Sequence, residues 1–397
     1  MSRPQNPDSN CASLGGRMRG ERRILRAQSG RFEQPDDGMK IVTIVGARPQ
    51  FIKAAAVSRR LRECHREVLV HTGQHYDDGM SAVFFRELGI PEPDHWLGVG
   101  SGSHGEQTGR MLAAIERVLL EERPDWVLVY GDTNSTLAGA LAAAKMHIPL
   151  AHVEAGLRSF NRRMPEEINR VLTDHVSTLL LCPSALAVSQ LAAEGITSGV
   201  LLVGDVMADA FQDAQERARH ESGILETLGV TAGAYWLATV HRAENTDAPD
   251  RLRSILAAFD AIGSPEAPLL FAVHPRPRIA LERICWTGSA GVRLLGPLAY
   301  LDMARLQSEA RGILTDSGGV QKEAYWAGVP CTTLRDETEW IETVSTGWNA
   351  LAGADTERIV SLAGRSRPVG PRPPLYQTGS AAAAVVSSLF TPTSLDV

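Results

Sequence analysis

The stretch 40-KIVTIVGARPQFIKAA-55 decides the fold of this chain. Its first seven residues form an apolar run typical of a buried strand, and the turn at Gly46 leads into a helical pattern. A second helix is predicted over residues 105–122, where apolar side chains recur on one face ahead of Pro124. Further strand-like runs in the first half are 67-EVLVHTG-73, 126-WVLVYGD-132, 178-TLLLC-182 and 200-VLLVGD-205. The opening segment therefore begins a β-α-β alternation.

The alternation starts again in the second half of the chain. The strand-like runs there are 235-YWLATVH-241, 268-PLLFAVHP-275, 291-GVRLLGP-297 and 312-GILTDSGG-319. Because 397 residues exceed the usual size of one domain, about 100–200 residues, we predict a second parallel sheet rather than an extension of the first. The predicted fold class is α/β, with two Rossmann-like, doubly wound domains. The predicted parts are a disordered tail (1–38), two domains (39–207 and 208–372) and a C-terminal helix with its tail (373–397).

Composition excludes several classes of protein. The formal net charge of −6 gives no electrostatic reason to expect nucleic acid as a partner. Residues 1–38 contain no apolar run long enough for a signal peptide or a membrane span, so no membrane partner is expected. The cysteines show no paired spacing and are interpreted as reduced thiols of a cytoplasmic protein. They are Cys11, Cys64, Cys182, Cys285 and Cys331.

Three acidic side chains stand close to predicted strand ends, where ligands of parallel α/β sheets bind. Asp132 follows the strand 126–132, Glu154 lies in 152-HVEAGLRS-159, and Glu166 lies in 165-PEEINR-170. Carboxylates in such positions suit acid–base chemistry. Each of them is equally interpretable as a helix cap or a first-turn acid.

Two turns are candidates for binding an anion at the N-terminus of a helix. In 46-GARPQFIKAA-55, backbone N–H groups and the cations Arg48 and Lys53 suit a phosphate, although two surface charges are an equal interpretation. The turn in 316-DSGGVQKEA-324 is a sharper signal, because glycines after a strand let the backbone approach a pyrophosphate. An ordinary strand–helix turn is its alternative. The candidate ligands there are Ser317, Gly318 and Gly319, with Glu323 for a ribose.

Histidines also follow predicted strands of the second half. His241 begins 241-HRAEN-245 and His274 begins 274-HPRPR-278, where a phosphate or a sugar is expected; buried core histidines are the alternative. No pair shows HxxxH spacing and no cysteine completes a ligand set, so neither a metal nor another cofactor is predicted.

Taken together and in order, these motifs resemble those of the non-hydrolysing UDP-GlcNAc 2-epimerase family. The resemblance covers residues 40–375 and implies a glycosyltransferase-B type fold, with the nucleotide between two domains. It further implies an enzyme, usually a homodimer, that converts UDP-GlcNAc to UDP-ManNAc by eliminating UDP to a 2-acetamidoglucal and adding it back. The motifs are GARPQFIK, HTGQH, YGDTNSTLAGA, HVEAGLRS, PEEINR, HRAEN, HP and DSGGVQKEA.

The resemblance also assigns roles to residues. Asp132, Glu154 and Glu166 match the family's functional carboxylates, and His241 matches its histidine near the phosphates. Which carboxylate is acid and which is base stays open. The residues that the resemblance implies for binding the UDP-sugar are Arg48, Lys53, Arg242, His274, Leu298, Met303, Ser317, Gly318, Gly319, Glu323 and Arg335.

Some motifs depart from the family's usual pattern. Trp340, in 338-TEWIE-342, stands where an arginine that contacts the nucleotide-sugar is expected, and 74-QHYDD-78 differs near the family's allosteric site. The variant motifs are similar to a branch that includes 2-epimerases of UDP-2,3-diacetamido-glucuronate, which is the alternative substrate. Arg158, Arg162 and Arg163 are candidates for binding its carboxylate, or are surface charges. A hydrolysing epimerase and a glycosyltransferase are the other functions considered.

Overall fold

The structure is a computed structural model that describes residues 38–74, 89–273, 275–376, 379 and 381–390. These residues belong to the compact unit Asp37–Val397. His274 and residues 1–37 of the predicted tail lie outside the described residues. The same holds for the side chains of Arg48, Pro275 and Arg276, which are placed only as helical residues.

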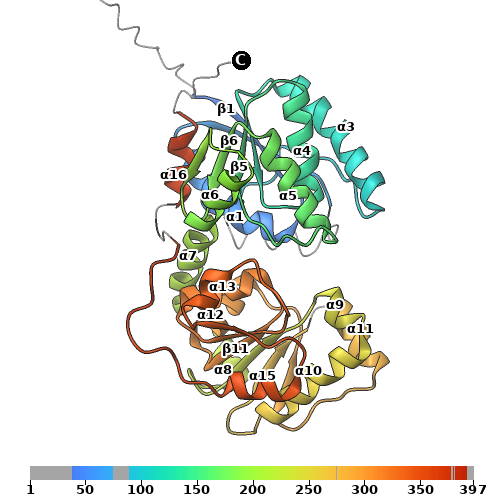
Figure 1. Cartoon of the computed structure of the whole chain (residues 1–397), viewed down its shortest axis with the longest axis vertical. Helices are drawn as coiled ribbons and strands as arrows, with labels where there is room; N and C mark the ends of the chain where they lie inside the picture. The colour runs from blue at the N-terminus through green and yellow to red at the C-terminus, as the bar shows by residue number, and fades with distance from the viewer. Residues whose placement is uncertain (1–37, 75–88, 274, 377–378, 380, 391–397) are drawn as a thin grey trace, which may run out of the picture. The chain divides into compact units, whose positions relative to one another are not determined.

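The first described sheet is parallel throughout, with the strand order β3-β2-β1-β4-β5-β6-β7 (Figure 1). Its strands are β1 Lys40–Val45, β2 Arg66–His71, β3 His95–Trp96, β4 Trp126–Tyr130, β5 Leu150–Val153, β6 Leu179–Cys182 and β7 Val200–Leu202. Ile41 and Val45 of β1 belong to the core on one face of the sheet, and Val42 and Ile44 to the core on the other. Because both faces are covered, the strands read as continuous apolar runs.

Helices cover both faces of this sheet. They are α1 Arg48–Leu61, α3 His104–Glu122, α4 Asn134–Lys145, α5 Pro165–Val176 and α6 Ala185–Ala193. The helix predicted over residues 105–122 is confirmed as α3, which begins after the N-cap Ser103 and buries Met111, Ile115 and Val118. In Figure 1, α3, α4 and α5 lie together on one side of the sheet, while α1, α6 and α16 lie on the other.

The second described sheet is also parallel, with the order β10-β9-β8-β11-β12-β13. Its strands are β8 Trp236–Thr239, β9 Leu269–Ala272, β10 Val292–Leu295, β11 Gly312–Thr315, β12 Cys331–Thr333 and β13 Asn349–Leu351. Its helices are α8 Ile224–Leu228, α9 Ala243–Thr246, α10 Pro249–Ile262, α11 Pro275–Arg283, α12 Tyr300–Glu309, α13 Gly318–Ala327, α14 Ile341–Ser345 and α15 Thr356–Ala363. The predicted pair of doubly wound α/β sheets is confirmed.

Two further helices join the halves of the chain. The helix α7, Val206–Glu221, follows the last strand of the first sheet and precedes the second sheet. The predicted boundary between residues 207 and 208 falls in its first turn, so the division into domains stays a prediction. The C-terminal helix α16, Ala381–Ser388, packs on α1 and α7, and Asp209 of α7 accepts N–H bonds from Gly379 and Ala382 at 2.9 and 2.8 Å.

The strand orders fix where ligands are expected to bind. In each sheet, successive strands are first added on one side of the first strand and then on its other side. The strand order therefore reverses between β1 and β4 in the first sheet, and between β8 and β11 in the second. Open parallel sheets bind ligands outside the carboxyl ends of the strands at this reversal. The turns found there begin at Gly46 and Gly131 in the first sheet, and at His241 and Asp316 in the second.

Candidate active site

Asp132 lies at the carboxyl edge of the first sheet, in the turn that follows β4. Its half-buried carboxylate accepts a bond from Arg170 Nη2 at 2.5 Å, and its carbonyl oxygen accepts from Asn169 Nδ2 at 2.9 Å. Both partners belong to α5. The cap of α4 is Thr133, whose hydroxyl accepts from the N–H of Thr136, so the interpretation of Asp132 as that cap is wrong.

Glu154 follows β5, the strand that pairs directly with β4. Its backbone has φ of 72°, in the left-handed region that non-glycine residues rarely occupy and that recurs at functional sites. The side chain is only 8% exposed; Oε2 pairs with Lys53 of α1, and Oε1 with Lys322 of α13 at 3.0 Å. Burial alone would raise the pKa of Glu154, but the charges and hydrogen bonds of the two lysines lower it to about 2. Glu154 is therefore an ionised, doubly held carboxylate at neutral pH.

Glu166 and its neighbour Glu167 lie in the first turn of α5 and differ completely in their surroundings. Glu167 is buried, and it accepts bonds from the N–H groups of Ser159 and Phe160 at 2.9 Å and from Arg170 at 3.0 Å. Glu166 is exposed and has no side-chain bond to another described residue. Glu167 therefore orders the preceding loop, whereas Glu166 is free to meet a ligand.

The first predicted anion turn is largely satisfied by the protein itself. The N–H groups of Gly46 and Ala47 donate to Gln50 Oε1 at 2.8 and 3.1 Å. The Lys53 ammonium forms an ion pair with Glu154. A Cβ at Gly46 would collide with the hydroxyls of Thr72 and Ser135, so close packing explains this glycine. Phosphate binding at Lys53 stays a prediction, as does that of Arg48.

The second sheet brings His241 and Asp316 together at its reversal point. Asp316 is fully buried and accepts N–H bonds from His241 at 3.0 Å and Arg242 at 2.9 Å, and from Asn245 Nδ2 at 3.1 Å. Burial alone would raise the pKa of Asp316, but His241 and these donors lower it. His241 Nδ1 lies 3.0 Å from Asp316 Oδ1, and the histidine side chain is 44% exposed. Nδ1–H therefore donates to Asp316, and Nε2 is the nitrogen left to face a ligand.

The turn Ser317-Gly318-Gly319 starts α13 beside this pair. The Ser317 hydroxyl caps the helix by accepting from the N–H of Val320 at 3.4 Å, and a Cβ at Gly318 would lie 2.6 Å from Glu339 Oε1. Glu323 is buried on the same helix and accepts from Gln307 Nε2 at 2.6 Å. The structure thus brings the predicted pyrophosphate turn and Glu323 onto one helix.

Arginines approach the turn from two sides. The buried Arg335 donates to Glu339 Oε2 at 2.9 Å, and Arg242 Nη2 lies 4.0 Å from Glu339 Oε1. Burial alone would raise the pKa of Glu339, but the charges of Arg335 and Arg242 lower it. These two cations therefore already have a carboxylate partner beside the turn.

Leu298 and Met303, predicted to lie beside the uracil, are partly buried and pack against the core that contains Leu306 and Ile313. This packing leaves their predicted contact with the uracil a prediction.

Two expectations from the sequence change with the structure. Arg158, a candidate for a uronate carboxylate, is 3% exposed and already paired with Asp174 at 2.7 Å and Glu194 at 2.6 Å, so it is unavailable. Trp340 is 4% exposed, and its ring centroid lies 3.9 Å from Lys322 Nζ. Trp340 is therefore a buried ring packed against Lys322 and beside Gly318, not an exposed replacement for an arginine.

Sequence reasoning missed several residues of this site. Asp316 and Lys322 both stand in the motif 316–324, where only the serine, the glycines and the glutamate were selected. The available signals were an aspartate directly between a strand and a glycine turn, and a lysine in a helix that is otherwise mostly apolar or small. Asp205, which accepts from Lys322 Nζ at 2.6 Å, also follows a predicted strand but was not selected. Arg170 gave no comparable signal, because helices commonly carry arginines.

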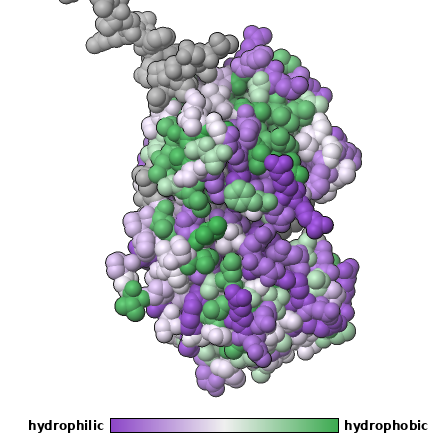
Figure 2. All heavy atoms as spheres, in the orientation of Figure 1, coloured by the Kyte–Doolittle hydropathy of each residue, from purple (hydrophilic) through white to green (hydrophobic). Residues whose placement is uncertain are grey.

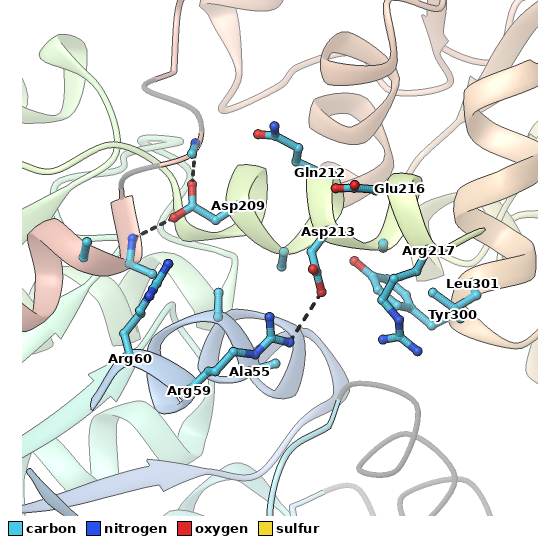
Figure 3. Close-up of a pocket in the computed structure, with 16 residues that line it drawn as sticks. Ala55, Arg59, Arg60, Asp209, Gln212, Asp213, Glu216, Arg217, Tyr300 and Leu301 are labelled. Carbon is cyan, nitrogen blue, oxygen red and sulfur yellow. Dashed lines mark hydrogen bonds and ion pairs between the residues drawn. The ribbon is translucent and has the colours of Figure 1, made fainter. Parts of the chain in front are cut away.

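A separate pocket lies away from these residues (Figure 3). It has a volume of about 270 Å³ and is lined by α1, α7, α12 and the start of α16. Arg59 of α1 points across it to Asp213 of α7 at 3.4 Å, and both side chains are about half exposed. The pocket contains none of the predicted site residues.

Among the described residues, no cluster of His, Cys, Asp or Glu has the arrangement of a metal site. No described helix is long and apolar enough to cross a membrane.

The chain has two doubly wound sheets, one with acids at its reversal point and one with a glycine turn and an Asp–His pair. This is the architecture of an enzyme with a fold of the glycosyltransferase-B type. The chain belongs to the UDP-N-acetylglucosamine 2-epimerase family, whose sequence profile matches residues 59–390.

Individual relatives agree with this assignment. A UDP-N-acetylglucosamine 2-epimerase homolog of Methanococcus maripaludis is 54% identical over 83% of this chain and 93% of its own length. A UDP-2,3-diacetamido-2,3-dideoxy-D-glucuronate 2-epimerase of Pseudomonas aeruginosa is 52% identical over 82% of this chain and 91% of its own. The crystal structure of the Methanocaldococcus jannaschii UDP-GlcNAc 2-epimerase, in complex with UDP-GlcNAc and UDP, superposes with a TM-score of 0.82 at 41% identity, over 88% of this chain and 99% of that one.

Proposed function

We propose that this protein inverts C2 of a UDP-linked N-acetylhexosamine and interconverts UDP-GlcNAc and UDP-ManNAc without releasing the free sugar. One observation carries the proposal: Lys322 of the second sheet's helix α13 contacts Glu154 at the edge of the first sheet. This contact joins the edge that bears the carboxylates to the helix that begins with the glycine turn. A UDP group on that turn would hold its sugar near the acids.

The chemistry that suits these groups is an elimination followed by an addition. A base removes the proton from C2 while the C1–O bond breaks and UDP departs, which leaves a C1=C2 double bond in a 2-acetamidoglucal. The glucal is then protonated at C2 on the opposite face, and UDP adds again at C1. Negative charge near C1 stabilises the oxocarbenium character that develops as UDP leaves.

The surroundings of the carboxylates suggest how these roles divide. Glu154, held by two lysines and with its pKa lowered to about 2, remains ionised and supplies fixed negative charge beside the sugar. Glu166 is exposed and free of side-chain bonds to the described residues, and Asp132 has one cationic partner, so these two are our candidates for proton transfer at C2. His241, oriented by Asp316, is proposed to donate from Nε2 to a phosphate oxygen.

The substrate has one close alternative, UDP-2,3-diacetamido-glucuronate. Two observations bear on the choice: the 52% identity to a 2-epimerase named for that substrate, and the fold shared with an enzyme solved with UDP-GlcNAc. Since Arg158 is buried in its own ion pairs, Arg162 and Arg163 are the cations left from the predicted set for a C6 carboxylate. Both are exposed.

The test is incubation of the protein with each UDP-sugar in deuterated water, followed by proton NMR. We expect the manno isomer with deuterium at C2 and no accumulation of free UDP. Release of free ManNAc and UDP would indicate a hydrolysing epimerase, and transfer to an added acceptor would indicate a glycosyltransferase. Turnover of only the diacetamido-uronate would move the assignment to that substrate, and no deuterium in either sugar would reject the proposal.

We also propose that the enzyme is a cytoplasmic homodimer with a domain division near α7. A cytoplasmic location is supported by Cys64, Cys182, Cys285 and Cys331, which are free thiols in the described part of the chain.

The dimer is supported by exposed apolar side chains of α5, Ile168 and Leu172, at 47% and 44% exposure one turn apart. Figure 2 shows hydrophobic surface in the region of α4 and α5. If Ile168→Glu/Leu172→Glu leaves the mass by light scattering unchanged, α5 is not the interface.

A further inference from the structure

Lys322 is a buried cation in the middle of α13. Its side chain is 1% exposed, and its Nζ lies 2.6 Å from Asp205 Oδ2 and 3.0 Å from Glu154 Oε1. A buried ammonium without partners would be strongly destabilising, so two carboxylates at these distances explain how the fold tolerates it. Asp205 caps α7 and Glu154 follows β5, so Lys322 connects three segments that are far apart in the sequence.

Aromatic rings surround the same ammonium. Lys322 Nζ lies 3.9 Å from the ring centroid of Trp340 and 5.6 Å from that of Trp326. Tyr376 packs edge-on against both indoles, with centroid distances of 6.2 and 5.9 Å. Cation–π attraction strengthens when the pair is removed from water, as it is here. The rings therefore keep the ammonium directed at its two carboxylates.

Glu154 receives its two cations from two different helices. Lys53 reaches Oε2 from α1, and Lys322 reaches Oε1 from α13. Gly131 closes a third side, since a Cβ there would lie 3.0 Å from Lys53 Nζ and 3.3 Å from Glu154 Oε2. With both oxygens held, the plane of the carboxylate is fixed, and the position of one oxygen depends on α13.

We propose that Lys322 is a positioning residue, which aligns Glu154 from the helix whose N-terminal turn binds the diphosphate of the substrate. This inference rests on the proposed function. The turn Ser317-Gly318-Gly319 and Lys322 belong to one ten-residue helix and its cap, so the nucleotide and the carboxylate are held by the same rigid element. Trp340 acts as the support on which the Lys322 ammonium rests.

The charges around Glu154 support this role. The groups that face it from the packed elements are Lys53 on α1 and Lys322 on α13, with Asp205 behind Lys322. Burial alone would raise the pKa of Glu154, and Lys322 is the larger of the two charges that lower it. Removing Lys322 therefore raises the pKa of Glu154 and frees one of its oxygens.

The experiment compares Lys322→Met/Asp205→Asn, Lys322→Arg and wild type, as full-length proteins. The double variant removes the lysine together with one buried partner, so that no second carboxylate is left unpaired. We expect kcat to fall about 10- to 100-fold, as is usual when a group that orients a reacting residue is lost, while UDP binds by calorimetry nearly as in wild type. The acid limb of the pH–rate profile should move to higher pH, and Lys322→Arg should restore part of kcat.

The control is Lys40→Met, which removes a lysine paired with Glu122 at 3.3 Å, outside the site residues. It should leave kcat and the pH profile unchanged. An unchanged kcat and pH profile in a folded double variant would overturn the positioning role, and so would a change in UDP affinity alone.

If wild type turns over none of the UDP-sugars, the proposed function fails, and the inference is then decided by carbon-13 NMR of glutamate-labelled protein. The Glu154 carboxyl resonance, assigned by comparison with Glu154→Gln, should titrate at higher pH without Lys322. The same titration in both proteins would overturn the inference independently of activity.

Discussion

The end of β5 and the first turn of α5 hold carboxylates of the same predicted role in opposite physical states. Glu154 is 8% exposed and paired with two lysines, whereas Glu166 is exposed and makes no side-chain bond to the described residues. A doubly paired carboxylate stays ionised and contributes fixed charge, while a free one exchanges protons with its ligand. Position at a strand or helix end therefore selects a carboxylate as a candidate, and its neighbours decide how it is held.

The largest effects should come from neutralising the three acids. Asp132→Asn, Glu154→Gln and Glu166→Gln should each lower kcat by about 10²- to 10⁴-fold, because each removes a charge or a proton carrier at the sugar. Binding of UDP by calorimetry should remain measurable. Glu357→Gln, at an exposed first-turn acid of α15, is the matched control and should behave as wild type. Near-normal turnover in all three variants would reject their assignment.

The contrast between held and free side chains extends to His241, whose partner Asp316 can be changed while the histidine itself is kept. Asp316→Asn keeps an acceptor for the N–H groups of His241 and Arg242 but loses the charge that orients His241 Nδ1. We expect kcat to fall about 10- to 100-fold, since the imidazole loses its fixed tautomer.

Asp260→Asn serves as the control for this change. Asp260 accepts from Trp286 Nε1 at 2.9 Å and from the N–H of Ser289 at 2.7 Å, away from the strand ends. Equal losses in both variants would indicate a general structural effect rather than orientation of His241.

A smaller effect is expected at Gly131, the glycine against which the Lys53–Glu154 pair packs. Its φ is 62°, and an added Cβ would lie 3.0 Å from Lys53 Nζ. Gly131→Ala should lower the free energy of unfolding by about 1–3 kcal/mol and reduce kcat by displacing the pair. Gly229→Ala isolates the backbone contribution, because Gly229 has φ of 60° and an added Cβ there would meet no atom within 4 Å. If both variants lose equal stability and keep full kcat, the collision at Gly131 is unimportant.

The sequence predicted both sheets and the edge that carries the site, because buried parallel strands are continuous apolar runs whose polar residues gather at their carboxyl ends. The short strands β3, β12 and β13 were not predicted, because none of them lies in a long apolar run. The equally short β7 was predicted, because it opens the apolar run 200-VLLVGD-205. Of the site, Asp132, Glu154, His241 and the glycine turn could be selected by position. The network of Lys53, Glu154, Lys322 and Asp205 could not, because its contacts join residues 101, 168 and 117 positions apart, which only packing brings together.

The pH dependence of stability offers the smallest and most specific test of the contrast between Glu154 and Glu166. The pKa of Glu154 is lowered from 4.5 to about 2 in the folded protein, so its ionised form is favoured by folding. A depressed carboxyl pKa stabilises the fold above the unfolded value, and that contribution is lost as pH falls from about 4.5 toward 2. Thermal unfolding of wild type and Glu154→Gln should therefore differ most above about pH 5 and converge toward about pH 2. At neutral pH, Glu166→Gln should change the stability little, because this exposed carboxylate has no side-chain bond to the described residues. A gap between wild type and Glu154→Gln that is independent of pH would mean that the two lysines do not hold Glu154 ionised, and that the two carboxylates differ in burial alone.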